Sequence, residues 1–296
     1  MRCSLGLLRV LRIIGLLSLG WLLVACSMVK MAYEQSPQLL TWWLDNHLDF
    51  NTIQSTQIRE ELSQLQQWHR RTQLPRYAEL LQKIERLMPG SLTQEQVCSL
   101  AEDVRTKLIA ISEQAAAPMA TTAMTLNEAQ IQHLEGRYAK SNKAGRKDWL
   151  EASPKAQAEK RLDQMEDRLG LLYGRLTDAQ RELLRRAIAS SPFDPALSHA
   201  ERQRRQQDTA ETLRQVVAGK LPQAQAQRLM QGYVARTLAS PVLAYRTYLD
   251  GAIQHTCATL ADLHNSTSPE QRDHAIRQLQ AYAQDARDLA AAARER

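Results

Sequence analysis

The chain has 296 residues, of which 44% are hydrophobic and 24% are charged. This balance is typical of a globular protein and excludes wholesale disorder, because disordered chains lack the apolar residues needed to bury a core. The 11 Gly, 10 Pro and 2 Phe argue against a sandwich or barrel, and the net charge of +6 is too dispersed to indicate a nucleic-acid partner.

The first 25 residues have the pattern of a removable signal peptide. Arg2, Arg9 and Arg12 precede an apolar run from Ile13 to Ala25. A membrane-spanning helix needs about 20 apolar residues, so this run is too short to remain as a span and instead matches a signal-peptide core. Loss of the three arginines would lower the net charge from +6 to +3.

The end of this run, Leu23-Val24-Ala25-Cys26, resembles the lipobox of bacterial lipoproteins. The resemblance implies cleavage before Cys26 and acyl chains such as palmitate on that residue, so membrane lipid is an expected partner. An ordinary secretory signal with an accidental Cys is the alternative. Ser27 stands where Asp would imply retention in the inner membrane, so we expect the periplasmic face of the outer membrane.

The expected organisation is a signal peptide (1–25), a lipidated tether (26–35) and an all-α domain (36–296). In the oxidising periplasm, Cys98 and Cys257 are the cysteines that remain to form a pair. Either they form a disulfide or both are buried thiols.

Helix starts are marked by two recurring signals. Five sites place a capping residue directly before Pro, the order favoured at the first turn of a helix: Ser36-Pro37, Ser153-Pro154, Asp194-Pro195, Ser240-Pro241 and Ser268-Pro269. Three others place Thr or Asn after Leu, with Gln three residues later to complete a capping box: 92–96, 126–130 and 176–180.

Apolar residues after these starts recur every three or four positions, as on one face of a helix. Such stripes occupy 97–111, 162–176, 249–260 and 276–289. A face turned to the core is a commoner cause than a cofactor site, so no cofactor is expected. The sequence therefore predicts an all-α fold, with about eleven amphipathic helices in a bundle or array and no sheet. Segments 115–125 and 141–153 could be joints, but neither is long enough to demand two domains.

Two aromatic segments carry a resemblance to a known family. The stretch from Trp42 to Phe50, and the later Trp68-His69-Arg70 with Leu74-Pro75-Arg76-Tyr77, are similar to an uncharacterised family of proteobacterial lipoproteins. The resemblance implies a lipid anchor and no assigned activity. Asn51 stands where Asp would be expected, a departure that affects only a helix cap.

The capping boxes at 92–96 and 176–180 also resemble the Leu-Thr-x-x-Gln motifs of Spy-like periplasmic chaperones, which are cradles of amphipathic helices. That resemblance implies a chaperone-like protein for periplasmic or outer-membrane clients. A capping box in any helical protein produces the same letters, so this remains an alternative.

The sequence offers only weak candidates for metal ligands or catalytic residues. Asp45, His47 and Asp49 could be metal ligands, but residues two apart on a helix point in different directions, so no metal site is expected. His69 could be a general base, although it lacks a carboxylate at helical spacing. We therefore identify no catalytic residue, and enzymatic activity remains uncertain.

Surfaces are the remaining candidates. Basic clusters at 146–147, 181–186 and 202–205 mostly have acids nearby and are expected to be solvated helix faces, with contact to anionic lipid headgroups or cell-wall acids as the alternative. Large aromatic residues beside a cation either pack in the core or form an interface. The candidate interaction surface comprises Trp42, Trp43, Trp68, His69, Arg70 and Tyr77.

The function that this sequence favours is that of a non-catalytic binding or scaffold protein of the envelope, with an unknown envelope protein as its partner. A chaperone-like cradle and an envelope hydrolase that uses His69 are the alternatives.

Overall fold

The structure, a computed structural model, describes residues 29–293. This part of the chain is all-α and contains no strand, which confirms the expected fold class. After helical residues 29–34 come eleven helices: α2 (Ser36–Leu48), α3 (Thr52–Thr72), α4 (Leu74–Leu87), α5 (Gln94–Ala123), α6 (Glu128–Trp149), α7 (Pro154–Tyr173), α8 (Asp178–Ser190), α9 (Pro195–Gly219), α10 (Gln223–Leu238), α11 (Leu243–Asn265) and α12 (Pro269–Ala291).

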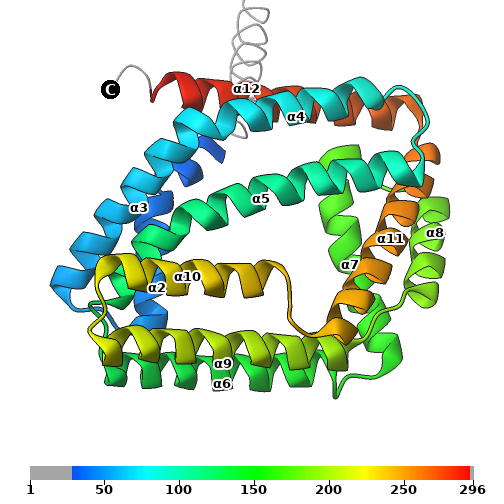
Figure 1. The fold of residues 1–296 in the computed structure, drawn as a ribbon. Coiled ribbons are helices and arrows are strands. Elements are labelled where there is room, and N and C mark those ends of the chain that lie inside the picture. Colours follow the sequence, from blue (N-terminus) through cyan, green and yellow to red (C-terminus); the bar gives the residue numbers. More distant parts are fainter. Residues whose placement is uncertain (1–28, 294–296) are drawn as a thin grey trace, which may run out of the picture.

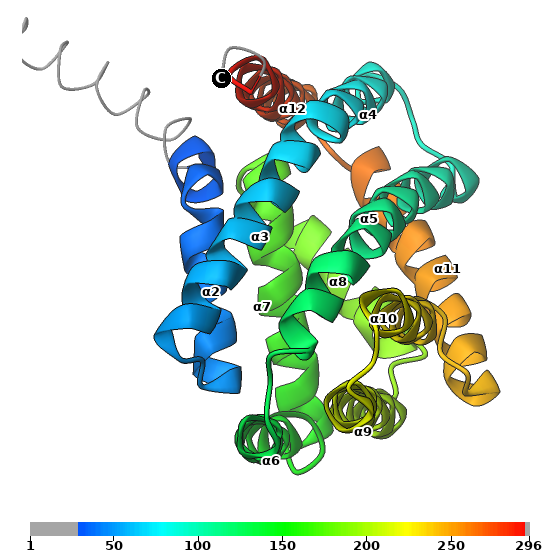
Figure 2. The same ribbon diagram turned by 60° about the vertical axis from the view of Figure 1, so that its left-hand side comes forward.

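The helices form a four-sided frame (Figure 1). α4 and α12 lie side by side along one edge, α6 and α9 lie along the opposite edge, α2 and α3 form one side, and α7, α8 and α11 form the other. α5 and α10 cross the interior, as the turned view also shows (Figure 2). The apolar core is therefore divided into clusters, the largest of which surrounds the fully buried Leu184 and Leu263.

Most predicted helix caps are confirmed, and two are wrong. The predicted caps of α5 to α9 and of α12 each accept a hydrogen bond from a first-turn backbone N–H. Ser36 does not cap α2, because residues 29–34 are already helical and its hydroxyl accepts from Gln66 instead. Ser240 donates to buried Glu201, and α11 begins only at Leu243.

Both segments that could have been joints are mostly helix. α5 continues through Pro118 to Ala123, and α6 continues to Trp149. The low polarity near the end of α5 has a packing cause, because Ala116, Ala120 and Ala123 are completely buried in a cluster with Met230 of α10. Such small side chains let two helices pack closely, and a linker is not needed to explain them.

Two of the predicted core-facing stripes, 162–176 and 276–289, pack into the apolar clusters. The stripe 97–111 does so only at its start. Val97 is buried, but Val104 and Leu108 are 45% and 54% exposed. That expectation was wrong for the middle of α5.

Two pairs of glutamines join capping boxes from distant parts of the chain. Gln54 of α3 and Gln130 of α6 exchange side-chain hydrogen bonds of 3.3 and 2.9 Å. Each amide oxygen also accepts from the backbone N–H of its own cap, Asn51 or Asn127. Each amide nitrogen also donates to a backbone carbonyl just before the partner's helix. Gln54 donates to the carbonyl of Thr125 at 2.6 Å, and Gln130 donates to the carbonyl of Asp49 at 3.0 Å. All polar groups of these buried amides are thereby satisfied.

The same arrangement recurs on the other side of the frame. Gln180 of α8 and Gln271 of α12 exchange hydrogen bonds of 2.8 and 3.1 Å. Their nitrogens also donate to the carbonyls of Ser266 and Arg175. Hydrogen bonds thus join helix starts directly across 76 and 91 positions of the sequence.

Cys98 and Cys257 are joined by a disulfide that links α5 to α11. The amide of Asn265 strengthens this junction by accepting from the N–H of Leu92 at 2.8 Å and donating to its carbonyl at 2.9 Å. In the simple loop model, a link between residues 159 apart removes about 5 kcal/mol of unfolded-chain entropy.

Part of the expected tether is packed against the body. Lys30 pairs with Asp285, at 3.3 Å, and with Asp288 of α12. The carbonyl of Tyr33 accepts from Gln66 of α3 at 2.6 Å. Cys26 and the expected signal peptide lie outside the described residues. Among the helices that are described, none combines the length and apolar character needed to cross a membrane.

We expect Gln54→Ala to lower the free energy of unfolding by about 2–4 kcal/mol, since it removes both hydrogen bonds with the amide of Gln130 and leaves the N–H of Asn51 without a partner. Urea denaturation followed by circular dichroism measures this loss. The exposed Gln67 of the same helix is the matched control, and Gln67→Ala should change stability by less than about 0.5 kcal/mol. Additive effects of Gln54→Ala and Gln130→Ala in a double-mutant cycle would contradict the reciprocal pair.

Candidate functional site

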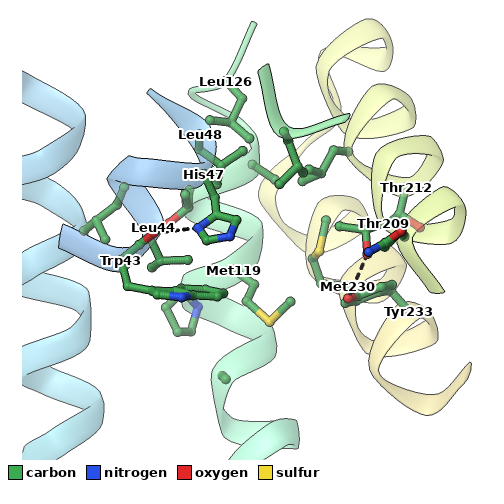
Figure 3. A pocket seen from close by; sticks show the side chains of 18 of the residues that line it. Trp43, Leu44, His47, Leu48, Met119, Leu126, Thr209, Thr212, Met230 and Tyr233 are labelled. Carbon is green, nitrogen blue, oxygen red and sulfur yellow. Dashed lines mark hydrogen bonds between the residues drawn. The ribbon is translucent and has the colours of Figure 1, made fainter. Parts of the chain in front are cut away.

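An apolar pocket of about 570 Å³ lies between six helices of the frame, α2, α3, α5, α6, α9 and α10. Figure 3 shows α2 on one side of it and α9 and α10 on the other. The volume falls within the range of about 300–1,000 Å³ that is usual for small-molecule sites. Its apolar lining comprises Trp43, Leu44, Leu48, Ile58, Leu62, Leu65, Ala115, Pro118, Met119, Ala123, Leu126, Leu134, Leu213 and Met230.

Helical periodicity explains how each wall presents its side chains. Leu44 and Leu48 are one turn apart on α2, and Ile58, Leu62 and Leu65 follow the same spacing on α3. The glutamine pair of Gln54 and Gln130 brings the start of α3 against the start of α6. That junction places the apolar face of α2 and α3 opposite Leu126 and Leu134, which pack with Leu48.

An aromatic pair stands on the α2 side of the pocket. The rings of Trp43 and His47 have centroids 4.3 Å apart, and a nitrogen of His47 donates to the carbonyl of Trp43 at 2.8 Å (Figure 3). Trp43 is 52% exposed although it lines the pocket. One face of the indole is therefore available to solvent or to a ligand.

The α9 side of the pocket is polar. The hydroxyl groups of Thr209 and Tyr233 lie 3.0 Å apart (Figure 3), and Thr209 also donates to the carbonyl of Arg205 at 2.8 Å. Burial raises the pKa of the nearby Tyr138 hydroxyl. These groups, with Gln206 and Arg202, also line an adjoining hollow of about 370 Å³, which we call the polar annex.

A buried carboxylate lies in the wall of the polar annex. Glu201 is 4% exposed and accepts hydrogen bonds from Arg204 at 2.9 Å, Arg205 at 2.8 Å and Ser240 at 2.9 Å. Burial alone raises the pKa of this carboxyl, but the three donors outweigh burial and lower the pKa to about 2. The two ion pairs lie within α9, and the hydrogen bond from Ser240 joins the helix to the segment that leads into α11.

The six residues of the expected interaction surface do not share one environment. Trp42 and Trp43 are exposed on α2, with Trp42 at 65%. His69 and Arg70 are buried at the junction of α3 and α4, while Trp68 and Tyr77 are partly buried. The structure therefore separates an exposed tryptophan pair from a buried cluster.

The buried cluster is organised by a tyrosine of the N-terminal segment. The hydroxyl of Tyr33 lies 2.8 Å from Nδ1 of His69, and the guanidinium of Arg70 stacks 5.3 Å from the ring centroid of Tyr33. Tyr77 meets His69 edge-on at 5.2 Å. Burial lowers the pKa of His69 and raises that of Tyr33 to about 12. These contacts fasten the N-terminal segment to α3 and α4, which is a packing role.

The acidic and histidine residues near the end of α2 have local structural roles. Asp45 accepts from the N–H of Phe50 at 2.9 Å, and Asp49 ends the helix in the left-handed region with φ of 49°. Within residues 29–293, no group of three or more His, Cys, Asp and Glu residues is placed to hold a metal. The pocket itself was not foreseen, because its lining comes from six helices and has no shared sequence signal.

The family relationship is established by sequence. A family model described as "Family of unknown function (DUF6279)" matches residues 46–232, more than half of the chain, so the protein belongs to that family. The matched region includes all of α3, α5, α6 and α9, and it begins within α2 and ends within α10. No curated protein and no solved structure matches the chain.

We expect the stability contributed by Glu201 to depend on pH. Its pKa is lower in the folded protein than the ordinary value of 4.5, so the unfolded chain binds the proton more readily. The contribution is complete above about pH 4.5 and is lost as the pH falls towards about 2. Glu201→Gln should therefore destabilise the protein by about 3 kcal/mol at pH 7 and by much less at pH 2.5.

Denaturant titrations at several pH values measure this difference. The exposed Glu211 of the same helix is the matched control, and Glu211→Gln should keep the pH dependence of the unmodified protein. If Glu201→Gln destabilised the protein equally at both pH values, the lowered pKa of Glu201 would be contradicted.

Proposed function

We propose that this protein is a non-catalytic binding protein of the bacterial envelope and that its apolar pocket holds an apolar part of another envelope component. The pocket is the observation that carries the proposal. A cavity of this size that is lined mainly by Leu, Met, Ala and Trp is suited to binding by burial of apolar surface. Ile58, Ala123 and Met230 of the lining are buried, so a ligand would meet a site that is partly formed in its absence.

The location forms part of the proposal. The Leu23-Val24-Ala25-Cys26 sequence supports a lipid anchor on Cys26, and Ser27 supports the periplasmic face of the outer membrane. The packing of Lys30 and Tyr33 on the body leaves only a few residues between that lipid and the folded helices. The pocket would then work close to the membrane surface, where apolar ligands are concentrated.

A chaperone-like role is the second candidate, and the exposed part of α5 favours it. Val104, Leu108 and Ile111 continue at helical spacing into Ala115 and Pro118 of the pocket. An apolar stripe that leads from solvent into a pocket could hold part of an unfolded outer-membrane protein.

We expect Cys26→Ala to abolish lipid attachment and processing at that site, since the thioether requires the thiol. Globomycin, which blocks cleavage of lipidated precursors, should likewise cause the precursor of the unmodified protein to accumulate. Metabolic labelling with an alkyne-bearing palmitate, followed by membrane fractionation, measures both effects. Cys98→Ala is the matched control and should retain the label. Equal labelling of the Cys26→Ala chain would rule out the proposed anchor.

We expect the chain from Ser27 onward, which contains every described helix, to bind the neutral apolar dye N-phenyl-1-naphthylamine with increased fluorescence. Ala115→Trp places a large ring in the pocket and should weaken that binding at least tenfold. Ala101→Trp, at an exposed position of α5 outside the pocket, is the control and should bind as before.

Circular dichroism would show whether each variant is folded, and Thr122→Phe fills the same pocket from another position if Ala115→Trp is not. The proposal would be contradicted if the unmodified chain did not bind the dye. It would also be contradicted if both folded pocket variants bound the dye as tightly as the unmodified chain. Displacement of the dye by an unfolded outer-membrane protein, but not by lipids, would favour the chaperone-like role.

A further inference from the structure

The charges around the apolar pocket are arranged asymmetrically. We infer that the pocket binds an amphiphile with one apolar chain and an anionic head, and that Arg202 receives the head. This inference rests on the proposed binding function and specifies its ligand class. It depends on the polar end of the pocket, where Arg202 lines both the apolar pocket and the polar annex.

Arg202 reaches from α9 across to α6. Its guanidinium donates a hydrogen bond to the hydroxyl of Ser141. One turn further along α6 is Gly145, and a Cβ atom there would lie only 2.9 Å from a guanidinium nitrogen of Arg202. The absence of a side chain at Gly145 therefore leaves room for the guanidinium between the two helices.

In the part of the chain that the structure describes, Arg202 has no acidic partner. Among residues 29–293 it forms no ion pair, whereas Arg204 and Arg205 of the same helix both bind Glu201. The carboxylate of Glu201 is thus already matched by two guanidinium groups. Helical spacing turns Arg202, Gln206 and Thr209 towards the pocket. One cation with unused donors consequently lies at the end of an apolar cavity.

Neighbouring groups suit an anion as well. Gln206 has an amide that can donate, and the hydroxyl groups of Tyr138 and Tyr233 line the same end. A guanidinium binds carboxylate or phosphate through two parallel hydrogen bonds, and neutral donors can complete the coordination. The other ionisable groups of the lining, His47 and Glu61, belong to α2 and α3 on the opposite side of the pocket from α9.

The dimensions favour a single chain. The cavity volume of about 570 Å³ lies in the lower half of the usual range for small-molecule pockets. A fatty acid or a lysophospholipid has one chain and one compact head, whereas lipids with several chains would need a larger space. Both sources share the chemistry that the pocket would recognise, an apolar chain that ends in an anion.

The test compares 11-(dansylamino)undecanoic acid with its methyl ester, which has the same chain and fluorophore but no charge. The chain from Ser27 onward should bind the acid at least tenfold more tightly than the ester. Arg202→Gln should weaken binding of the acid about tenfold, the effect of losing one charge-assisted hydrogen-bond pair, and leave binding of the ester unchanged. Arg228→Gln, at an exposed position of α10 outside the pocket, should alter neither.

Competition by oleate and by oleoyl lysophosphatidic acid then distinguishes a carboxylate head from a phosphate head, and displacement by either supports the inference. Equal affinity for acid and ester, or equal weakening of both by Arg202→Gln, would overturn the role of Arg202 while leaving an apolar binding protein. Failure of the unmodified chain to bind acid, ester and N-phenyl-1-naphthylamine alike would refute the proposed function itself. Gly145→Leu, which displaces the guanidinium without removing it, should reproduce the selective loss of acid binding.

Discussion

The pairing of buried glutamines at the ends of helices is the interaction on which the frame depends. A helix start has backbone N–H groups without partners inside the helix, and burial of such groups is costly unless other groups satisfy them. Gln54 pairs in this way with Gln130, and Gln180 pairs with Gln271. Each side-chain amide bonds to the backbone N–H of its own cap residue, to the partner's amide and to a carbonyl in the turn before the partner's helix. Helix starts can therefore meet in the interior without unsatisfied groups at these amides.

This way of joining helices explains why the body contains a pocket. A bundle of parallel helices closes around one core, whereas helices that meet at their ends form a frame with separate apolar clusters (Figure 1). The crossing helices α5 and α10 fill part of the interior, and their small residues allow close contact between them. The space that remains beside α2 and α3 is the apolar pocket (Figure 3).

The arginine residues of α9 have two different roles. Arg204 and Arg205 neutralise buried Glu201, and Arg204 also donates to the carbonyl of Arg236 of α10, so their charges serve the fold. Arg202 forms no such pair in the described part of the chain and faces the pocket. Arg202 is exposed, so its guanidinium retains its charge and can be reached by an anion from solvent. The cluster expected to be a solvated face thus contains both a structural site and a candidate ligand site.

Several local features could be predicted from the sequence because they depend on residues close together in the chain. Thr93, Asn127 and Thr177 were identified as caps from their spacing to Gln, and the structure contains each of them. The all-helical fold followed from apolar periodicity. The caps predicted at Ser36 and Ser240 were wrong for a tertiary reason, since each hydroxyl bonds to a side chain of a neighbouring helix. Tertiary contacts also explain the low polarity of segment 115–125, whose alanines are buried against α10.

By itself, then, the sequence determined the fold class and most helix starts, because caps and periodic stripes act within one or two helical turns. It also pointed to Cys98 and Cys257 as a pair, which the structure joins. Only the tertiary structure decided that His69 and Arg70 are buried, that Leu108 is exposed and that Arg202 faces a cavity. The lining of that cavity comes from six helices between positions 43 and 233, and no local pattern specifies which side chains such distant segments bring together.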